Sequence, residues 1–146
     1  MTEQLRIGII GFDTSHVPAF TRLLNDPNDP YHIPGGQVVA GYPSFSPDLE
    51  ASYSRVEGFK VEVVDKWGIK MVDSIDELLP LVDAVLLESV DGRRHLDEVR
   101  AVIAAGKPVY VDKPLAADYA QAADIVRLAQ GARCPLFSSS SLRFDA

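Results

Sequence analysis

The sequence predicts an α/β fold: a doubly wound, mainly parallel sheet of about six strands, with helices on both faces. Short apolar runs such as VDAVLL, residues 82–87, are typical of strands that are buried on both faces. These runs alternate with amphipathic stretches along the whole chain, for example Leu96, Val99 and Ile103 at helical spacing. Such an alternation requires right-handed crossovers and therefore a parallel sheet.

The element boundaries follow from apolar periodicity, capping residues and helix breakers. We expect strands at about residues 5–10, 37–42, 70–72, 82–87, 108–111 and 136–138. We expect helices at about residues 15–25, 75–79, 92–105 and 119–130, with Ser74 and Asp118 as caps and Gly106 as a stop. Three prolines and two glycines make residues 25–36 an extended loop. Residues 49–67 are expected to be partly helical with a break at Gly58, although Val61, Val63 and Val64 suit a strand equally well.

Composition limits the class of protein. The chain has 146 residues, of which 47% are hydrophobic, and this suits one domain spanning residues 1–146. The net charge of −7 argues against a nucleic-acid partner and against an anionic membrane surface, because both bind basic faces. The single cysteine, Cys134, excludes an intrachain disulfide and a cysteine metal cluster, so we expect no metal. The single cysteine also indicates a reducing cytoplasm, so we expect a cytoplasmic protein. The N-terminus does not resemble a signal peptide, and no apolar run reaches membrane-spanning length.

The first strand runs into a glycine turn and then directly into a helix, in the stretch RIGIIGFDTSH, residues 6–16. This order opens a dinucleotide-binding unit, so the fold is expected to be an NAD(P)-binding Rossmann fold. Gly11 permits the tight turn, and the backbone amides that follow it should form an anion site at the start of the helix. We therefore expect Gly11, Phe12, Asp13, Thr14 and Ser15 to contact the cofactor.

The glycine fingerprint is incomplete, because Asp13 and His16 stand where it has glycines. A carboxylate about 4 Å from a phosphate charge costs roughly 1 kcal/mol in bulk water, so Asp13→Gly is expected to tighten dinucleotide binding. The alternative is that Asp13 or Ser15 simply caps the helix. His16 is more typical of a packed or exposed histidine than of a catalytic one.

The end of the second strand lacks the charged residue that usually holds the adenosine ribose. An NAD-specific domain has an acid there and an NADP-specific one has a nearby arginine, but this chain reads Gly41-Tyr42-Pro43-Ser44. The nearest downstream base is Arg55. Ser44 or Ser46 is a candidate contact to a ribose or a 2′-phosphate, or is only a turn former.

Two further polar segments follow buried strands, ESVDGRRH at residues 88–95 and DKPLA at residues 112–116. Lys113 leaves its strand at the carboxyl edge of the sheet, where ligands bind in such folds. Pro114 fixes the chain direction, and a Lys–Pro bond can be cis. The alternative is that Lys113 and Asp112 form a surface ion pair that contributes little.

The order of RIGIIG, VDAVLLESVDGRRH, AAGKPVYVDKPLA and LRF resembles the nucleotide-binding domain of the Gfo/Idh/MocA oxidoreductases from end to end. That family has a Thr-Pro-Asn-x-x-His-type segment after strand 4 and Glu-Lys-Pro after strand 5. Ser89 and Asp91 lie near its threonine and asparagine, and His95 matches its histidine. Asp112, Lys113 and Pro114 match Glu-Lys-Pro.

The resemblance implies an oxidoreductase that uses NAD or NADP to move hydride to or from a sugar- or polyol-like alcohol. It implies Lys113 and His95 as catalytic residues and a small-molecule substrate, and it allows a homo-oligomer. The implied cofactor contacts are Gly11, Phe12, Asp13, Thr14, Ser15, Ser44, Ser89, Asp112, Lys113 and Pro114.

The family's second domain is absent from this sequence, so catalysis by these residues alone is not expected. We expect instead an exposed apolar patch near Leu142 and Phe144 and self-association. The competing hypothesis is a non-catalytic Rossmann-like module that has lost dinucleotide affinity. Asp13 and the missing acid of the second strand favour that hypothesis, whereas Asp112-Lys113-Pro114 favours the enzyme.

Overall fold

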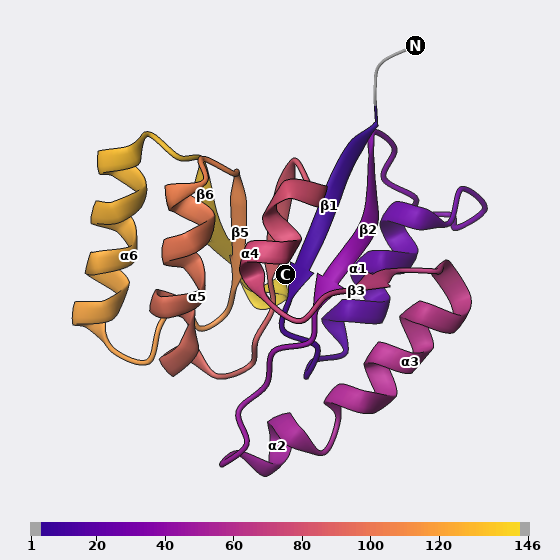
Figure 1. The fold of residues 1–146 in the computed structure, drawn as a ribbon, viewed down its shortest axis with the longest axis horizontal. Helices are drawn as coiled ribbons and strands as arrows, with labels where there is room; N and C mark the ends of the chain where they lie inside the picture. Colours follow the sequence, from indigo (N-terminus) through magenta and orange to yellow (C-terminus); the bar gives the residue numbers. More distant parts are fainter. Residues whose placement is uncertain (1–3, 144–146) are drawn as a thin grey trace.

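A computed structural model describes residues 4–143. The molecule is built on one six-stranded sheet with the strand order β3-β2-β1-β4-β5-β6 (Figure 1). Each strand pair in that order is parallel. The predicted doubly wound sheet is therefore confirmed, and its order reverses between β1 and β4, where such folds bind ligands.

The strands are β1 (Leu5–Ile10), β2 (Gly36–Tyr42), β3 (Lys70–Met71), β4 (Ala84–Leu87), β5 (Val109–Asp112) and β6 (Leu136–Ser139). The helices are α1 (His16–Asn25), α2 (Glu50–Tyr53), α3 (Val56–Trp67), α4 (Ile75–Leu78), α5 (Gly92–Ala104) and α6 (Tyr119–Ala132). Short 3₁₀ turns follow at Leu79–Leu81 and Ser141–Arg143. None of the helices in residues 4–143 is long and apolar enough to cross a membrane.

Two hydrophobic cores lie on opposite faces of the sheet, because successive strand residues point to opposite sides. Ile9 packs with Val17 of α1 and Val63 of α3 on one face. Ile10 belongs to the larger core on the other face, which α5 and α6 cover with residues such as Val99 and Ile125. Figure 1 shows the same division, with α1 and α3 on one side of the sheet and α5 and α6 on the other.

Most predicted elements are confirmed to within two residues, and the segment between β2 and β3 brings the main correction. It forms two helices that break at Ser54 and Arg55, so the break expected at Gly58 is wrong. Val61, Val63 and Val64 are helical, because Val63 is needed in the core beneath α3. Tertiary packing thus overrides their strand propensity.

Candidate functional site

Four strands end at one edge of the sheet, where the candidate site lies. Ile10 of β1 pairs with Tyr42 of β2 on one side and with Leu87 of β4 on the other, and Leu87 pairs with Val111 of β5. The next residues along these strands are Gly11, Pro43, Glu88 and Asp112. Parallel strands share a direction, so this edge gathers the loops that the sequence marks as candidate site.

The Gly11 turn requires glycine for two reasons. Its φ of +87° lies in the left-handed region, and a Cβ atom there would overlap the backbone nitrogen of Ser89. The next side chain, Phe12, is fully buried and packs against Gly41, which has no Cβ in the way. The Phe12 ring therefore belongs to the core, and a cofactor contact by this residue stays a prediction.

The backbone amides at the start of α1 are available to an anion. The N–H groups of Thr14 and Ser15 have no hydrogen-bond acceptor among residues 4–143. The Ser15 side chain is exposed and makes no capping bond, so the alternative that Ser15 caps the helix is wrong. Free N–H groups at the end of a ten-residue helix suit a phosphate, because the helix dipole adds to their charge.

Asp13 is turned into the protein and is not accessible to solvent. Its Oδ2 accepts a hydrogen bond from the Ser52 hydroxyl at 2.5 Å, and its Oδ1 accepts one from the Val90 backbone N–H at 3.0 Å. Ser52 lies in α2 and Val90 follows β4, so this carboxylate ties the turn after β1 to a helix and to the loop after β4. Asp13 neither caps α1 nor extends into the space above the turn, so the premise of the like-charge expectation is wrong.

His16 joins the start of α1 to the end of β5. Its Nδ1 lies 2.6 Å from Oδ2 of Asp112, and its ring stacks on Phe20 with centroids 5.1 Å apart. Oδ1 of Asp112 accepts from the Tyr110 hydroxyl at 3.0 Å and from the Lys113 backbone N–H at 2.8 Å. Burial and the neighbouring Asp112 raise the pKa of Tyr110 above its usual range, so its hydroxyl keeps the proton that it donates.

Lys113 is exposed, and its ammonium has no partner among the described residues. The bond between Lys113 and Pro114 is cis, which confirms that possibility for this pair. The alternative, a surface ion pair between Lys113 and Asp112, is not formed, because Asp112 is buried and bound to His16.

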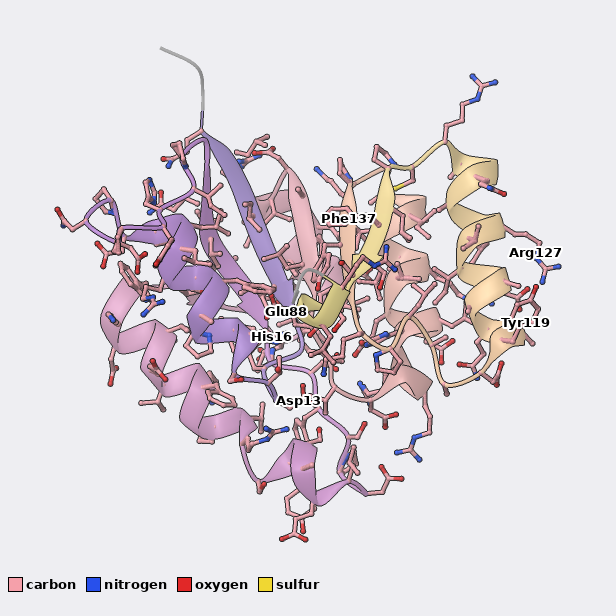
Figure 2. The ribbon with its side chains drawn as sticks, turned by 180° about the vertical axis from the view of Figure 1, so that it is seen from behind. Asp13, His16, Glu88, Tyr119, Arg127 and Phe137 are labelled. Carbon is pink, nitrogen blue, oxygen red and sulfur yellow. The ribbon has the colours of Figure 1, made fainter. Side chains whose placement is uncertain are left out.

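Glu88, the residue after β4, is fully buried (Figure 2). Neither of its carboxyl oxygens has a hydrogen-bond partner within residues 4–143. Burial raises the pKa of this carboxyl well above its usual range, and the charges of Asp112 and Asp13 raise it further. Glu88 therefore holds its proton in the folded protein where an exposed glutamate would have lost it.

The two candidate serines of the cofactor site are bound within the protein. Ser44 and Ser89 both donate to the carboxylate of Glu98 on α5, Ser89 at 2.8 Å. Arg94 pairs with the same carboxylate at 3.1 Å and donates to Ser44 Oγ at 2.8 Å. The structure thus brings an acid and a base from α5 to the end of β2, where the sequence has neither.

A second set of contacts holds the loop after β2 against α5. Ser46 donates to Asp91 at 2.7 Å, and Arg93 pairs with both Asp91 and Asp48. Hydrogen bonds from Arg93 hold the pKa of the Asp91 carboxyl well below its usual range. Asp91 is also the N-cap of α5, so both Arg93 and the helix dipole stabilise its negative charge.

His95 lies beneath these loops and is fully buried. Its Nε2 is 2.6 Å from the carbonyl oxygen of Ser89, and its Nδ1 is 3.2 Å from that of Leu115. Both ring nitrogens therefore contact backbone, and none faces the open edge of the sheet. In this arrangement His95 ties the loop after β4 to the loop after β5.

Comparison with known proteins identifies the family. A family model described as "Oxidoreductase family, NAD-binding Rossmann fold" matches residues 5–140. The chain belongs to the Gfo/Idh/MocA family. An inositol 2-dehydrogenase from Cereibacter sphaeroides is 34% identical to it over 131 residues, which are 88% of this chain and 33% of that relative. This chain therefore spans about a third of the length of a curated Gfo/Idh/MocA relative.

Solved structures share the fold of this family member. An oxidoreductase from Agrobacterium radiobacter in complex with NAD+, L-tartaric acid and magnesium superposes with a TM-score of 0.75 at 20% identity, over 97% of this chain and 37% of the other. The 3-ketoreductase KijD10 from Actinomadura kijaniata, in complex with NADP, gives 0.65 at 21% identity, over 94% and 37%. The Rossmann fold expected from the sequence is confirmed.

Sequence reasoning missed three features of this Gfo/Idh/MocA domain. It treated Glu88 only as the start of a polar segment, although an acid directly after the four-residue apolar run AVLL is a signal of burial. It did not place Arg94 and Glu98 at the end of β2, because they follow Ser44 by about fifty residues. It also favoured an ordinary role for His16, whose partner Asp112 is 96 residues away.

Proposed function

We propose that this chain binds NAD or NADP at the carboxyl edge of its sheet and serves an oxidoreductase. The hydride would pass between the nicotinamide and an alcohol carbon of a small sugar- or polyol-like substrate. The observation that carries the proposal is the 2.6 Å contact between His16 and Asp112. It holds the free amides of Thr14 and Ser15 and the exposed Lys113 at one edge, as a dinucleotide that spans the switch point requires.

The residues at this edge fit the phosphate end of such a cofactor. The N–H groups of Thr14 and Ser15 would donate to the pyrophosphate, and Gly11 lets the chain turn beneath it. Asp13 does not oppose it from the surface, because its carboxylate is directed inward at Ser52 and Val90. When bound, the nicotinamide supplies the hydride chemistry.

Lys113 is the proposed proton-transfer group. Its ammonium would donate to the substrate hydroxyl oxygen, orient it and exchange its proton. Asp112 accepts from the Lys113 backbone N–H at 2.8 Å and so fixes where the lysine leaves the strand, and Pro114 directs the chain away. His95 is assigned a positioning role instead of a catalytic one, because both of its ring nitrogens contact backbone carbonyls.

The substrate class rests on resemblance and on the named relative, an inositol 2-dehydrogenase. The residues described supply one side of a substrate site only. We therefore propose that residues 1–146 form a single cofactor domain and that further protein, in the same chain or in a second copy, supplies the facing wall. A cytoplasmic location is proposed from the single buried cysteine, Cys134.

The competing proposal is a non-catalytic Rossmann-like module. It is favoured by Ser44 and Ser89, because their hydroxyl groups donate hydrogen bonds to Glu98 and so cannot donate to a ribose. The two proposals differ in one measurable property, because only the first requires affinity for a dinucleotide.

Calorimetric titration of NADH and NADPH tests the proposal, with two variants of one residue. Ser15 has φ of −66°, which proline can adopt, so Ser15→Pro would delete the N–H donor and keep the turn. We expect Ser15→Pro to weaken dinucleotide binding about tenfold, the effect of one charge-assisted hydrogen bond. Ser15→Ala is the matched control, because it keeps the N–H group and should bind like the parent chain.

A titration that stays flat to millimolar NADH and NADPH removes the enzyme proposal for this chain and favours the module. Equal weakening by Ser15→Pro and Ser15→Ala would mean that the side chain, not the backbone amide, makes the contact. Circular dichroism of each variant checks that helix content is unchanged, so that lost binding reports the site.

A further inference from the structure

A hollow of about 270 Å³ lies beside the end of β2. Tyr42, the last residue of β2, forms one side, Asp76 at the start of α4 forms another, and Arg94, Asp97 and Glu98 of α5 complete it. In a Rossmann domain the adenosine ribose of a bound dinucleotide lies at the end of this strand. The hollow is therefore the space where the 2′ position of the ribose would be recognised.

The charges around the hollow are mostly negative. Asp76 and Asp97 are exposed and form no ion pair with any residue in 4–143. Glu98 is buried and pairs with Arg94 at 3.1 Å, so the one cation that lines the hollow is already neutralised. Two acids remain without a counter-charge in the space that a ribose substituent would enter.

The nearby base that the sequence offered does not change this balance. Arg55 lies between α2 and α3, and its Nε donates to the carbonyl oxygen of Ala51 at 2.7 Å. Arg93, next to Arg94, pairs with Asp48 and Asp91 on the loop after β2 and does not line the hollow.

NAD and NADP differ at this point by a phosphate of about two negative charges on the ribose 2′ oxygen. A neutral 2′ hydroxyl can donate to a carboxylate, whereas a 2′ phosphate has only acceptor oxygens to offer and is repelled by it. A site for the phosphate ordinarily presents an arginine with free donors. Here Nε and Nη2 of Arg94 contact Glu98 and Ser44, and the Glu98 carboxylate balances the charge of the guanidinium.

We propose that Asp76 and Asp97, at the rim of this hollow, make the chain select NAD(H) over NADP(H). The inference rests on the proposed dinucleotide function and adds the choice of cofactor to it. Glu98 contributes by holding Arg94 in its internal pair, so that α5 presents more negative than positive charge to the ribose.

The test compares NADH and NADPH dissociation constants, by fluorescence titration of the 146-residue chain at low salt. We expect NADH to bind about fivefold or more tightly than NADPH, the effect of two charges that act through water over about 8 Å. The ratio should fall as salt is added, because exposed charges are screened. The double variant D76N/D97N should bring the ratio close to one, mainly by strengthening NADPH binding.

The matched control is E62Q/D65N, which removes the same charge from two exposed positions of α3. E62Q/D65N should leave the ratio of the NADPH and NADH dissociation constants unchanged. If both double variants changed this ratio equally, only the net charge of the chain would matter, and the inference would be overturned. Equal affinities of the parent chain for NADPH and NADH would also overturn the inference. Arg94 would then be the charge that dominates the hollow, and the proposed dinucleotide function would remain. Absence of binding by both cofactors would remove the function, and the inference would be rejected with it.

Discussion

Glu88 combines full burial with the lack of any hydrogen-bond partner among the described residues. Burial is the main reason that its pKa is raised well above the ordinary value of 4.5 for a glutamate, with Asp112 and Asp13 adding to it. The folded state therefore keeps a proton that the unfolded state releases above that value. The contribution of Glu88 to the free energy of unfolding is therefore fully present below its unfolded-state pKa. It is lost as pH rises toward the raised pKa of the folded state.

The substitution Glu88→Gln should remove this pH dependence, because an amide of similar shape cannot ionise. We expect the free energy of unfolding of the parent chain to fall as pH rises above the ordinary glutamate pKa, by up to about 1.4 kcal/mol per pH unit for one group. The variant should lose less over the same range. Urea unfolding at a series of pH values measures both.

Glu62→Gln on α3 is the control for Glu88→Gln, because Glu62 is exposed. Its pH profile should match that of the parent chain. Parallel profiles for the parent and Glu88→Gln would show that Glu88 ionises normally in the folded protein.

Asp13 leads to a second prediction at this scale. Asp13→Ala should destabilise the fold by about 2–4 kcal/mol, because the Ser52 hydroxyl and the Val90 N–H would be left buried without their acceptor. Asp13→Asn should cost less, since one amide oxygen can still accept. Chemical denaturation gives both values, and a variant Asp13→Ala as stable as the parent would show that the tether contributes nothing.

The tether also reverses the binding expectation for this residue. Asp13→Gly was expected to relieve repulsion, but the carboxylate is inaccessible to solvent and faces Ser52 and Val90. Loosening of the turn should weaken dinucleotide binding. The positions of Gly11 and Lys113 could be predicted from strand ends alone, whereas the inward direction of Asp13 depends on contacts with residues 39 and 77 positions away.

Helix ends provide the prediction at the scale of the element. Asp118 caps α6, where its Oδ1 accepts from the Gln121 backbone N–H at 2.9 Å. Ser15 holds the same position on α1 without a side-chain bond. We expect Asp118→Ala to lower the free energy of unfolding by about 1 kcal/mol and Ser15→Ala to change it little. Thermal unfolding of the two variants tests the contrast, and equal losses would contradict it.

The two caps show which elements the sequence could predict. Asp118 and Gln121 form a local capping pattern, so the start of α6 could be predicted from the sequence, and it is confirmed. Ser74 likewise accepts from the Glu77 N–H at 3.2 Å. The break between α2 and α3 at Ser54 and Arg55 has no such local signal, since both residues are compatible with a helix interior.

At the scale of the whole molecule, one half of a sheet face has no helix over it within residues 4–143. α1 and α3 cover β1, β2 and β3 on that face, and α5 and α6 lie on the opposite side. Leu86, Tyr110 and Phe137 of the three remaining strands line an open groove of about 370 Å³ together with residues of α1. In Figure 2 the strand that carries Phe137 faces the viewer with no helix in front of it.

The groove lies beside the candidate site and is mostly apolar, with aromatic side chains from α1, β5 and β6. The ring of Phe20 on α1 meets the Tyr110 ring edge-on, with ring centroids 6.2 Å apart. The Tyr110 and Phe137 ring centroids are 5.1 Å apart. Phe137 is 64% exposed, an unusual position for a phenylalanine next to other apolar side chains. The sequence predicted an apolar patch further along, near Leu142, which is exposed, and near Phe144, which lies outside the described residues.

We expect this chain to self-associate through the groove when no other protein covers it, because burial of the aromatic side chains removes apolar surface from water. Phe137→Ser should shift sedimentation velocity profiles toward the monomer at concentrations where the parent chain associates. Tyr119→Ser on α6 is the control, since Tyr119 is 89% exposed on another part of the surface (Figure 2). A parent chain that remains strictly monomeric, or equal shifts in the two variants, would contradict the assignment of the groove as the interface.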